Sequence, residues 1–518
     1  MKKILQNRRQ FLLSTGSMAV ASGLSAPAWA DSTTRDVKGL REKIDHIVVI
    51  YQENRSFDHY YGTYQNPRGG TKVNNLLDAH GAIDSKFINM QKNPEGIVYN
   101  YLPVPDDIPG FYNAVLENKP FHMSPYIPAG DNVPWDPAHN YYRMNAQVDD
   151  GKMDQFVALA LRNPHAMPAT PDLLKDQDTA KIAFELSQPS GAVLGYYNRS
   201  DIPHYHKLAD EYVLFDNFFQ AMSGGSTGNA LYLAAGRSAQ WLQAPKSATT
   251  ADNFSLSDPP YDQHGILIND LPPLQGPTET SYGRLKIAPP VADQTYPSIG
   301  DRLNEAGISW AWYNENWNSV KPWALKTAFG PGDGSAVIDT TNLYVPHHNP
   351  FQYYPSWEGN VRAGHMRDAE DFFEDAKSGK LPQVSFIKAT GIHDEHPADS
   401  APQWGEKWVM SLLQQIASTP AWGRVAVIIT YDEGGGFWDH VAPPQPDAYG
   451  CGTRIPAFII SPYARRGYVD HKFGDTTSVL SFINARFGLK PLAGRDAQSY
   501  DMLDGLDFSQ KPRPPAFS

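Results

Sequence analysis

Six short apolar runs, separated by segments with helical periodicity, dominate the sequence. Runs of this kind, rich in β-branched and aromatic residues, are typical of strands buried on both faces of a parallel sheet. We expect strands at Ile47–Tyr51, Tyr212–Phe215, Ile308–Tyr313, Val384–Ile387, Val425–Thr430 and Ile455–Ile460. We expect helices at Asp368–Lys377, Trp404–Ala417 and Thr477–Phe487. This alternation predicts an α/β fold, a three-layer sandwich with a mostly parallel central sheet and large loop insertions.

Two of the predicted strands run directly into acidic side chains. Glu53 and Asn54 follow the first run, and Asp432 and Glu433 follow the fifth, just before three consecutive glycines. Ligands of open α/β sheets bind beyond the carboxyl ends of the strands, and oxygen ligands suit a hard divalent cation. Acidic loop residues are more often solvated groups or helix caps. Because acids occur at both strand ends, we predict a metal site there.

A glycine-rich segment, Ser223–Asn229, precedes the helical pattern of Ala230–Ala235. Backbone N–H groups at the start of a helix, together with the helix dipole, suit a phosphate. This environment, and a bound cation, would lower the pKa of the Ser226 hydroxyl and make it a nucleophile. The simpler alternative is that Ser226 or Thr227 only caps the helix.

Histidines in Pro- and Gly-rich loops are further candidates for the site. Although a single histidine is usually structural, loops on a rigid sheet are where binding and catalytic residues concentrate. Imidazoles can neutralise phosphoryl oxygens and protonate a departing oxygen. The candidates are His139, His347, His348, His396 and His440.

The charge balance excludes one broad class of function. With 44 Lys and Arg against 56 Asp and Glu, the formal net charge is −12. An acidic protein of this kind is poorly suited to bind nucleic acid or anionic lipid. Cys451 is the single cysteine, so an intrachain disulfide is excluded, and we expect its side chain to pack as a small apolar group.

Residues 1–30 have the pattern of a twin-arginine signal peptide. Arg8 and Arg9 precede the mildly apolar segment Phe11–Leu24, and Ala28-Trp29-Ala30 forms a cleavage site. A short membrane anchor is the alternative, but the segment is short and weakly apolar for a span. We therefore expect the twin-arginine export machinery as a partner and a periplasmic or secreted location. Residues 31–518 then form one domain, with an irregular rim or lid inserted near residues 240–295.

Several motifs together resemble those of a bacterial phosphoesterase family. They are "ENRSFDHYYG", "GSTGNALYLAAG", "YDEGGGFWDHVAPP" and "RIPAFIISPYA". The family contains acid phosphatase A and the haemolytic and non-haemolytic phospholipases C, and is related to the alkaline phosphatase and sulfatase folds. "PHHNPFQYY" and "DPAHN" look closer to the acid phosphatase A branch.

The resemblance implies a role for each candidate residue. One divalent metal ion, of open identity, would be held by Glu53, Asn54, Asp432 and Glu433, with Ser226 as both ligand and nucleophile. Four histidines would surround the phosphate: His139, His347, His348 and His396. Glycines stand near Ser226 where the family often has proline, so the substrate, a small phosphate ester or a phospholipid, stays open.

We therefore expect an exported, metal-dependent phosphoesterase, an acid phosphatase in the first place and a phospholipase C as the alternative. If several of the histidines must be protonated, activity should rise below neutral pH, because a free histidine titrates near pH 6.5. Gly224–Gly228 also matches the G-x-S-x-G motif of serine esterases, with Asp439 and His440 as triad partners. A sulfatase is disfavoured because Cys451 lacks the sequence context of its modified nucleophile. A secreted binding module without turnover is the remaining alternative.

Overall fold

The computed structural model describes most of residues 36–517. Not described are residues 1–35, 70–71, 106–107, 134, 163–186, 245–248, 250–259, 272, 274–277, 280–293, 295, 325–336, 339–343, 355–363, 493 and 518. The expected signal peptide and much of the expected rim near residues 240–295 therefore lie outside the described residues. Residues 36–518 form one compact unit.

An eight-stranded sheet is the centre of this unit, and all six predicted strands belong to it. Its strand order is β13-β11-β14-β1-β15-β16-β8-β17. The strands are β1 (His46–Gln52), β8 (Val213–Phe215), β11 (Trp310–Asn314), β13 (Met366–Asp368), β14 (Val384–Lys388), β15 (Val425–Tyr431), β16 (Ala457–Ile460) and β17 (Tyr468–Asp470). The predicted α/β class with a mostly parallel sheet is confirmed.

One strand differs from the expectation of parallel pairing. β16 runs antiparallel to both of its neighbours, β15 and β8, whereas the other pairs in the sheet are parallel. Every residue of β16 is buried, as in the parallel strands. A strand buried on both faces carries the same apolar pattern in either direction, so its sequence could not reveal the reversal.

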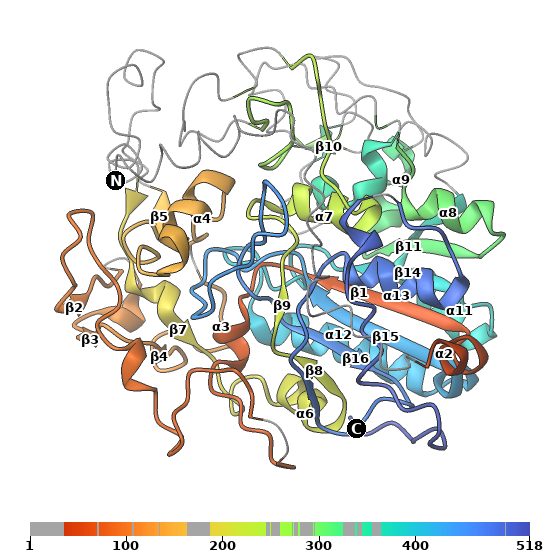
Figure 1. Cartoon of the computed structure of the whole chain (residues 1–518), viewed down its shortest axis with the longest axis horizontal. Coiled ribbons are helices and arrows are strands. Elements are labelled where there is room, and N and C mark those ends of the chain that lie inside the picture. The colour runs from red at the N-terminus through yellow and green to blue at the C-terminus, as the bar shows by residue number, and fades with distance from the viewer. Residues whose placement is uncertain are drawn as a thin grey trace, which may run out of the picture. The chain divides into compact units, whose positions relative to one another are not determined.

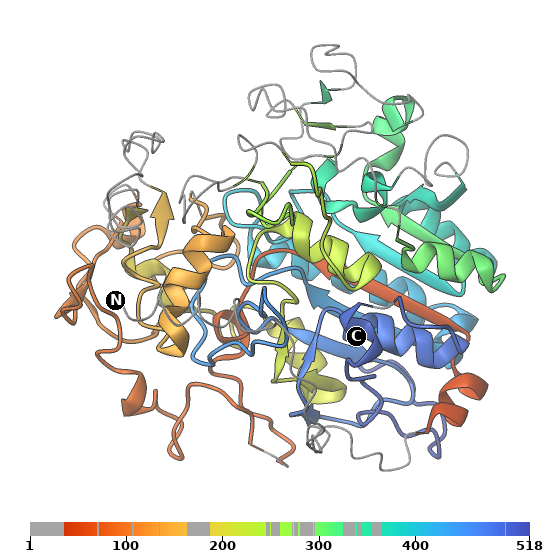
Figure 2. The same ribbon diagram turned by 45° about the horizontal axis from the view of Figure 1, so that its top comes forward.

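Helices pack in two groups against the sheet, which gives three layers (Figures 1 and 2). In one group α13 contacts α2 and α7, and α7 contacts α8; in the other, α12 contacts α6 and α11. The first group contains α2 (Val37–Lys43), α7 (Ser226–Ala235), α8 (Ile299–Glu305) and α13 (Ser478–Phe487). The second contains α6 (Pro203–Glu211), α11 (Ala369–Ser378) and α12 (Pro402–Ala417).

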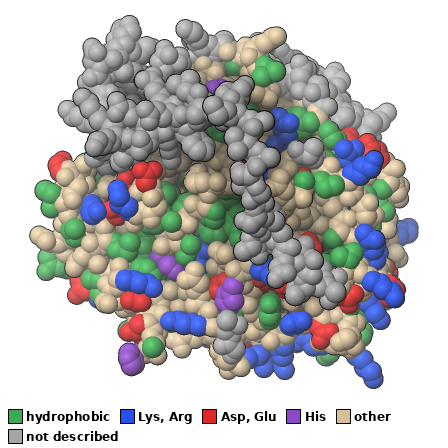
Figure 3. Space-filling model, in the orientation of Figure 1, with side chains coloured by type: hydrophobic (Ala, Val, Ile, Leu, Met, Phe, Trp, Pro, Cys, Tyr) green, Lys and Arg blue, Asp and Glu red, His purple; other side chains and the backbone are tan. Residues whose placement is uncertain are grey.

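Shorter elements lie beside the sheet, several of them between β1 and α6 in sequence (Figure 1). The helices are α3 (Phe57–Tyr61), α4 (Tyr141–Val148) and α9 (Trp317–Ala324). The two-residue strands are β2 (Tyr101–Leu102), β3 (Leu116–Glu117), β4 (Phe121–His122), β5 (Leu161–Arg162), β6 (Ser187–Gln188), β7 (Gly195–Tyr196), β9 (Phe218–Phe219), β10 (Thr278–Glu279), β12 (Val337–Ile338) and β18 (Gly474–Asp475). Acidic and basic side chains are interspersed on the face seen in Figure 3. No helix in the described part of the chain is both long and apolar enough to cross a membrane.

A carboxylate from one helix caps another in the second layer. α6 begins at Pro203 and has no side-chain cap from its own N-cap residue, Ile202. Glu406 of α12 supplies the acceptor instead: its Oε1 accepts from the backbone N–H groups of His204 at 2.7 Å and Tyr205 at 2.9 Å. The two helices are therefore joined by a buried polar contact.

Candidate active site

The two acidic strand ends meet because β1 and β15 are adjacent parallel strands. Gln52 at the end of β1 pairs with Tyr431 at the end of β15, so the residues that follow leave the sheet side by side. The Asp432 backbone N–H donates to the Gln52 carbonyl at 3.0 Å, and the Asn54 N–H donates to Asp432 Oδ1 at 3.1 Å. These bonds fix the two loops against each other.

Oxygen atoms face one another at this junction. Glu53, Asp432 and Glu433 are fully buried. The Asn54 side-chain oxygen lies 3.1 Å from Glu53 Oε2 and 2.9 Å from Asp432 Oδ1, with no proton between them. With the amide turned over, its nitrogen would donate to both carboxylates and its oxygen would accept from His396 Nε2 at 2.7 Å. The contact between oxygens is relieved either by turning the amide over or by a cation among the oxygens.

Burial beside other acids shifts the pKa values of the glutamates in this cluster. Burial raises the pKa of Glu53 well above its usual value, and Asp432 raises it further, while Lys388 opposes the shift. Burial also raises the pKa of Glu433, with His139 opposing. Glu433 Oε2 is buried without a hydrogen-bond partner. Carboxylates whose ionisation is this costly, one of them with a partnerless buried oxygen, fit a divalent cation, since such an ion would stabilise their charged forms.

Ser226 lies between the two loops. Its Oγ is 3.3 Å from Glu53 Oε2 and 3.2 Å from Glu433 Oε1, so either carboxylate can accept the hydroxyl proton. Ser226 is the first residue of α7, after the N-cap Gly225. The expected open N-terminus of this helix is partly filled: Asp270 Oδ1 accepts from the Thr227 N–H at 2.9 Å.

The four predicted histidines lie around the carboxylates, and the pKa values of His139 and His348 shift in opposite directions. His139 Nε2 is 4.0 Å from Glu433 Oε1; burial lowers the pKa of His139, yet Asp136 and Glu433 raise it well above the usual value. His348 Nδ1 is 3.2 Å from Glu53 Oε1. Burial, with His347 and Lys388 nearby, lowers the pKa of His348 well below the usual value. Nothing in the sequence pattern predicted that the pKa values of these two histidines would shift in opposite directions.

The remaining two histidines flank this pair. The rings of His347 and His348 are 4.3 Å apart, and those of His139 and His396 are 5.7 Å apart. His396 Nδ1 donates to the carbonyl of Pro397 at 2.5 Å, which leaves Nε2 facing the Asn54 amide. All nine predicted site residues therefore lie in one connected cluster.

A comparison with protein families identifies the chain. The model of the phosphoesterase family matches residues 44–490. The chain belongs to this family. The resemblance of its motifs is therefore confirmed at the level of the family.

Relatives of this phosphoesterase include several bacterial phospholipases C. It is 26% identical to the haemolytic phospholipase C of Pseudomonas aeruginosa over 93% of this chain and 59% of that protein. It is 27% identical to phospholipase C B of Mycobacterium tuberculosis over 91% of this chain and 79% of that protein. The chain thus spans less than two thirds of the Pseudomonas relative.

Solved structures show a more distant likeness. A protein in the alkaline phosphatase superfamily from Vibrio parahaemolyticus is 11% identical, with a TM-score of 0.30, over 57% of this chain and 63% of that chain. A lipoteichoic acid synthase from Listeria monocytogenes is 12% identical, with a TM-score of 0.33, over 59% of this chain and 70% of that chain.

Side chains outside the predicted set also lie in the cluster. Lys388, at the end of β14, is fully buried and ion-paired with Glu53 Oε1. Asp394 is fully buried, and its Oδ1 accepts from the His396 N–H at 2.8 Å. Asp270 contacts the start of α7. A polar residue at the end of a predicted strand was a signal for Lys388, whereas Asp394 and Asp270 had none.

The residues of the alternative serine triad do not come together. His440 Nδ1 is 2.7 Å from Asp58 Oδ2, and Asp439 Oδ1 accepts from Arg454 at 2.9 Å. Within the described chain, the Ser226 hydroxyl has only carboxylate partners. Asp58, Asp439 and His440 are close enough to hold an ion, as are Asp136, His139 and His396. In the first group, however, Arg454 already supplies the positive charge.

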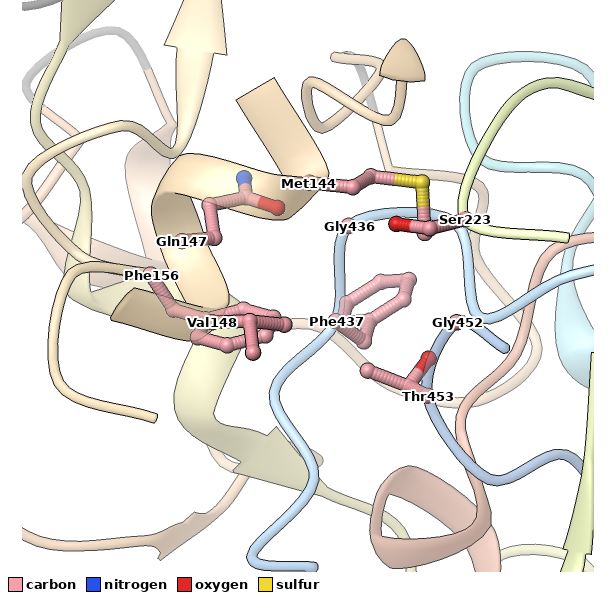
Figure 4. A pocket seen from close by; sticks show the side chains of 9 residues that line it. All are labelled: Met144, Gln147, Val148, Phe156, Ser223, Gly436, Phe437, Gly452 and Thr453. Atoms are coloured by element: carbon pink, nitrogen blue, oxygen red, sulfur yellow. The ribbon is translucent and has the colours of Figure 1, made fainter. Parts of the chain in front are cut away.

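A narrow gap lies between α4 and the glycine-rich loop that follows β15 (Figure 4). α4 forms one wall with Met144, Gln147 and Val148, and Phe437 and Thr453 face it. None of the nine predicted site residues lines this gap. We therefore distinguish it from the cluster around Ser226.

Proposed function

We propose that the protein is an exported, metal-dependent phosphoesterase that cleaves phosphate esters through a phosphoserine at Ser226. The observation that carries the proposal is the position of the Ser226 hydroxyl between the carboxylates of Glu53 and Glu433. Membership of the phosphoesterase family supports hydrolysis of phosphoric ester bonds. Neither observation indicates which alcohol is esterified to the phosphate in the substrate.

In the proposed reaction, Ser226 Oγ attacks phosphorus and transfers its proton to one of the two carboxylates that it contacts. The new Oγ–P bond forms as the ester P–O bond breaks, and the departing alcohol takes up a proton. Water then cleaves the phosphoserine, which releases phosphate and restores the serine. A divalent ion held by Glu53, Asn54, Asp432, Glu433 and Ser226 would lower the pKa of the hydroxyl and neutralise phosphoryl charge.

The histidines would contribute around the phosphoryl group. His139, His347, His348 and His396 extend from loops on different sides of the carboxylates. Their N–H groups can donate to the phosphoryl oxygens, whose charge must be stabilised during transfer. The expected rise in activity below neutral pH stays a prediction, to be checked by a rate profile from pH 4 to pH 9.

The first candidate substrate is a phosphomonoester, hydrolysed as by an acid phosphatase. A phospholipid cleaved as by a phospholipase C is the second, because relatives with that name align with about nine tenths of this chain. Metal-replete protein assayed with p-nitrophenyl phosphate and with phosphatidylcholine would separate the two. The substrate with the higher kcat/KM identifies the branch.

Two perturbations test the chemistry itself. S226A should lower kcat at least about 10³-fold on whichever substrate is hydrolysed, because the nucleophile is lost. S223A is the matched control, since Ser223 lies in the same glycine-rich segment but lines the gap of Figure 4. Chelation should abolish activity, and added divalent metal should restore it. Full activity in S226A, or after complete chelation, would exclude the proposal.

Export is proposed from the sequence alone. Replacing the pair Arg8 and Arg9 by lysine should keep the protein in the cytoplasm, because the twin-arginine machinery reads that pair. Cell fractionation measures the outcome. Unchanged export of the variant would contradict this route.

A further inference from the structure

Lys388 is a charged side chain in the interior of the sheet. It ends β14, where it pairs with Tyr51 of β1 on one side and with Asn314 of β11 on the other. Its side chain is 0% exposed, and Nζ is ion-paired with Glu53 Oε1. An ammonium group loses its hydration on burial, so it stays charged in such a place only beside a compensating anion.

The two oxygens of Glu53 face different groups. Oε1 faces Lys388 Nζ and also His348 Nδ1, which is 3.2 Å away. Oε2 faces the Ser226 hydroxyl at 3.3 Å and the Asn54 amide at 3.1 Å. Lys388 and His348 therefore hold one oxygen of this carboxylate away from the serine and leave the other directed at it.

The charge around Lys388 is strongly negative. Four fully buried acids lie in the cluster: Glu53, Asp394, Asp432 and Glu433. A divalent cation alone would leave a surplus of negative charge if all four were ionised, and that surplus would repel a phosphate ester. A fixed ammonium reduces the surplus without occupying a position where substrate must bind.

We infer that Lys388 is a positioning residue of the proposed phosphoesterase site. Its ammonium holds Glu53 so that only Oε2 is available to the cation and to Ser226, and it offsets part of the carboxylate charge so that a phosphate can approach. The inference rests on the proposed function. It assigns Lys388 two effects of opposite sign: it weakens cation binding and strengthens phosphate binding.

Mn²⁺ binding tests the first effect without any turnover. Calorimetric titration of Mn²⁺ into the S226A background should give at least tenfold tighter binding in K388M, because a neighbouring positive charge is removed. K388Q keeps a hydrogen-bond donor for Glu53 but lacks the charge, so it should bind Mn²⁺ more tightly as well. K92M is the control, since Lys92 forms a partly buried ion pair with Asp154 in a different part of the fold.

Inhibition by inorganic phosphate tests the second effect in the enzyme with Ser226 intact. In Mn²⁺-loaded protein, the inhibition constant for phosphate should rise at least tenfold in K388M and K388Q, and kcat should fall. A purely structural ion pair would instead weaken both ligands together, in step with a lower Tm. K388Q, nearer to lysine in its hydrogen bonding, provides the test if K388M does not fold.

The inference is overturned if both variants bind Mn²⁺ with unchanged or lower affinity. It is equally overturned if phosphate inhibition is unchanged. Failure of the proposed function has a different signature, namely an S226A protein that retains its phosphoesterase activity. The Mn²⁺ titration does not depend on that activity.

Discussion

Replacement of Glu406 by glutamine should make the protein more stable at alkaline pH. The buried carboxylate caps α6 through the N–H groups of His204 and Tyr205. A glutamine side-chain oxygen can accept from the same two groups. E406Q therefore removes the charge and keeps the cap, so the effect of ionisation can be measured by itself.

The size and the sign of the effect follow from the pKa of Glu406. Burial raises this pKa to about 7, although the hydrogen bonds from Tyr205 and His204 lower it, whereas an unfolded glutamate titrates near 4.3. The folded protein thus binds the proton more tightly than the unfolded chain. Stability from this group is fully present below about pH 4.3 and is lost as the pH rises through about 7. The loss is about 4 kcal/mol, because the pKa differs by about 2.7 units at about 1.4 kcal/mol per unit.

Thermal unfolding of the wild type and E406Q at pH 5 and pH 8.5 measures the difference. The unfolding entropy of a chain of this size is roughly 1 kcal/mol per kelvin. E406Q should therefore have a Tm about 4 °C higher than the wild type at pH 8.5 but only about 1 °C higher at pH 5. Relative to E406Q, which keeps the acceptor, E406A should be less stable by about 2 kcal/mol at both pH values. If the Tm difference between E406Q and the wild type were the same at both pH values, Glu406 would not ionise in this range.

Two further variants test the contacts that frame the site. R454M should lower the free energy of unfolding by about 3–5 kcal/mol, because Asp439 loses its cationic partner and Asp58 keeps only His440. R424M is the control: Arg424 forms an exposed pair with Asp45, so the loss should be under about 1 kcal/mol. Urea unfolding gives both values, and equal effects would contradict the reasoning. G435A should weaken Mn²⁺ binding about tenfold, since Gly435 has φ +60° and a Cβ there would lie 2.5 Å from the Asn54 carbonyl oxygen. G423A, with open space around it, should bind Mn²⁺ normally, and calorimetry would reveal a failure of either expectation.

The candidate residues at the strand ends could be predicted because sheet geometry is regular. Glu53 and Asp432 each follow a buried strand, and parallel strands deliver such residues to one edge of a sheet. The position of Ser226 had a weaker signal, a glycine-rich turn before a helix. Both the acidic strand ends and the glycine-rich turn before Ser226 are local sequence patterns, so they can be recognised without knowing how the chain packs.

Other features depend on packing, and the sequence predicted at most their position along the chain. Lys388 follows an apolar run, where lysine usually turns to solvent, yet the neighbouring strands enclose it beside Glu53. His139 and His348 both lie in proline-containing loops. Their pKa values move in opposite directions because carboxylates raise that of His139, whereas burial and nearby cations lower that of His348. The groups that shift these pKa values are mostly distant in sequence, so no local sequence pattern predicts the shifts.

The two loops that hold the carboxylates are neighbours in space but 378 positions apart along the chain, from Asn54 to Asp432. During synthesis, the ribosome must therefore make more than four fifths of the polypeptide before the second loop exists. Closing so long a loop is entropically costly and slow. A chain that ends before β15 would contain Ser226 and Glu53 but neither Asp432 nor Glu433. Tight binding of the ion is therefore expected only after β15 and the loop that follows it have been synthesised.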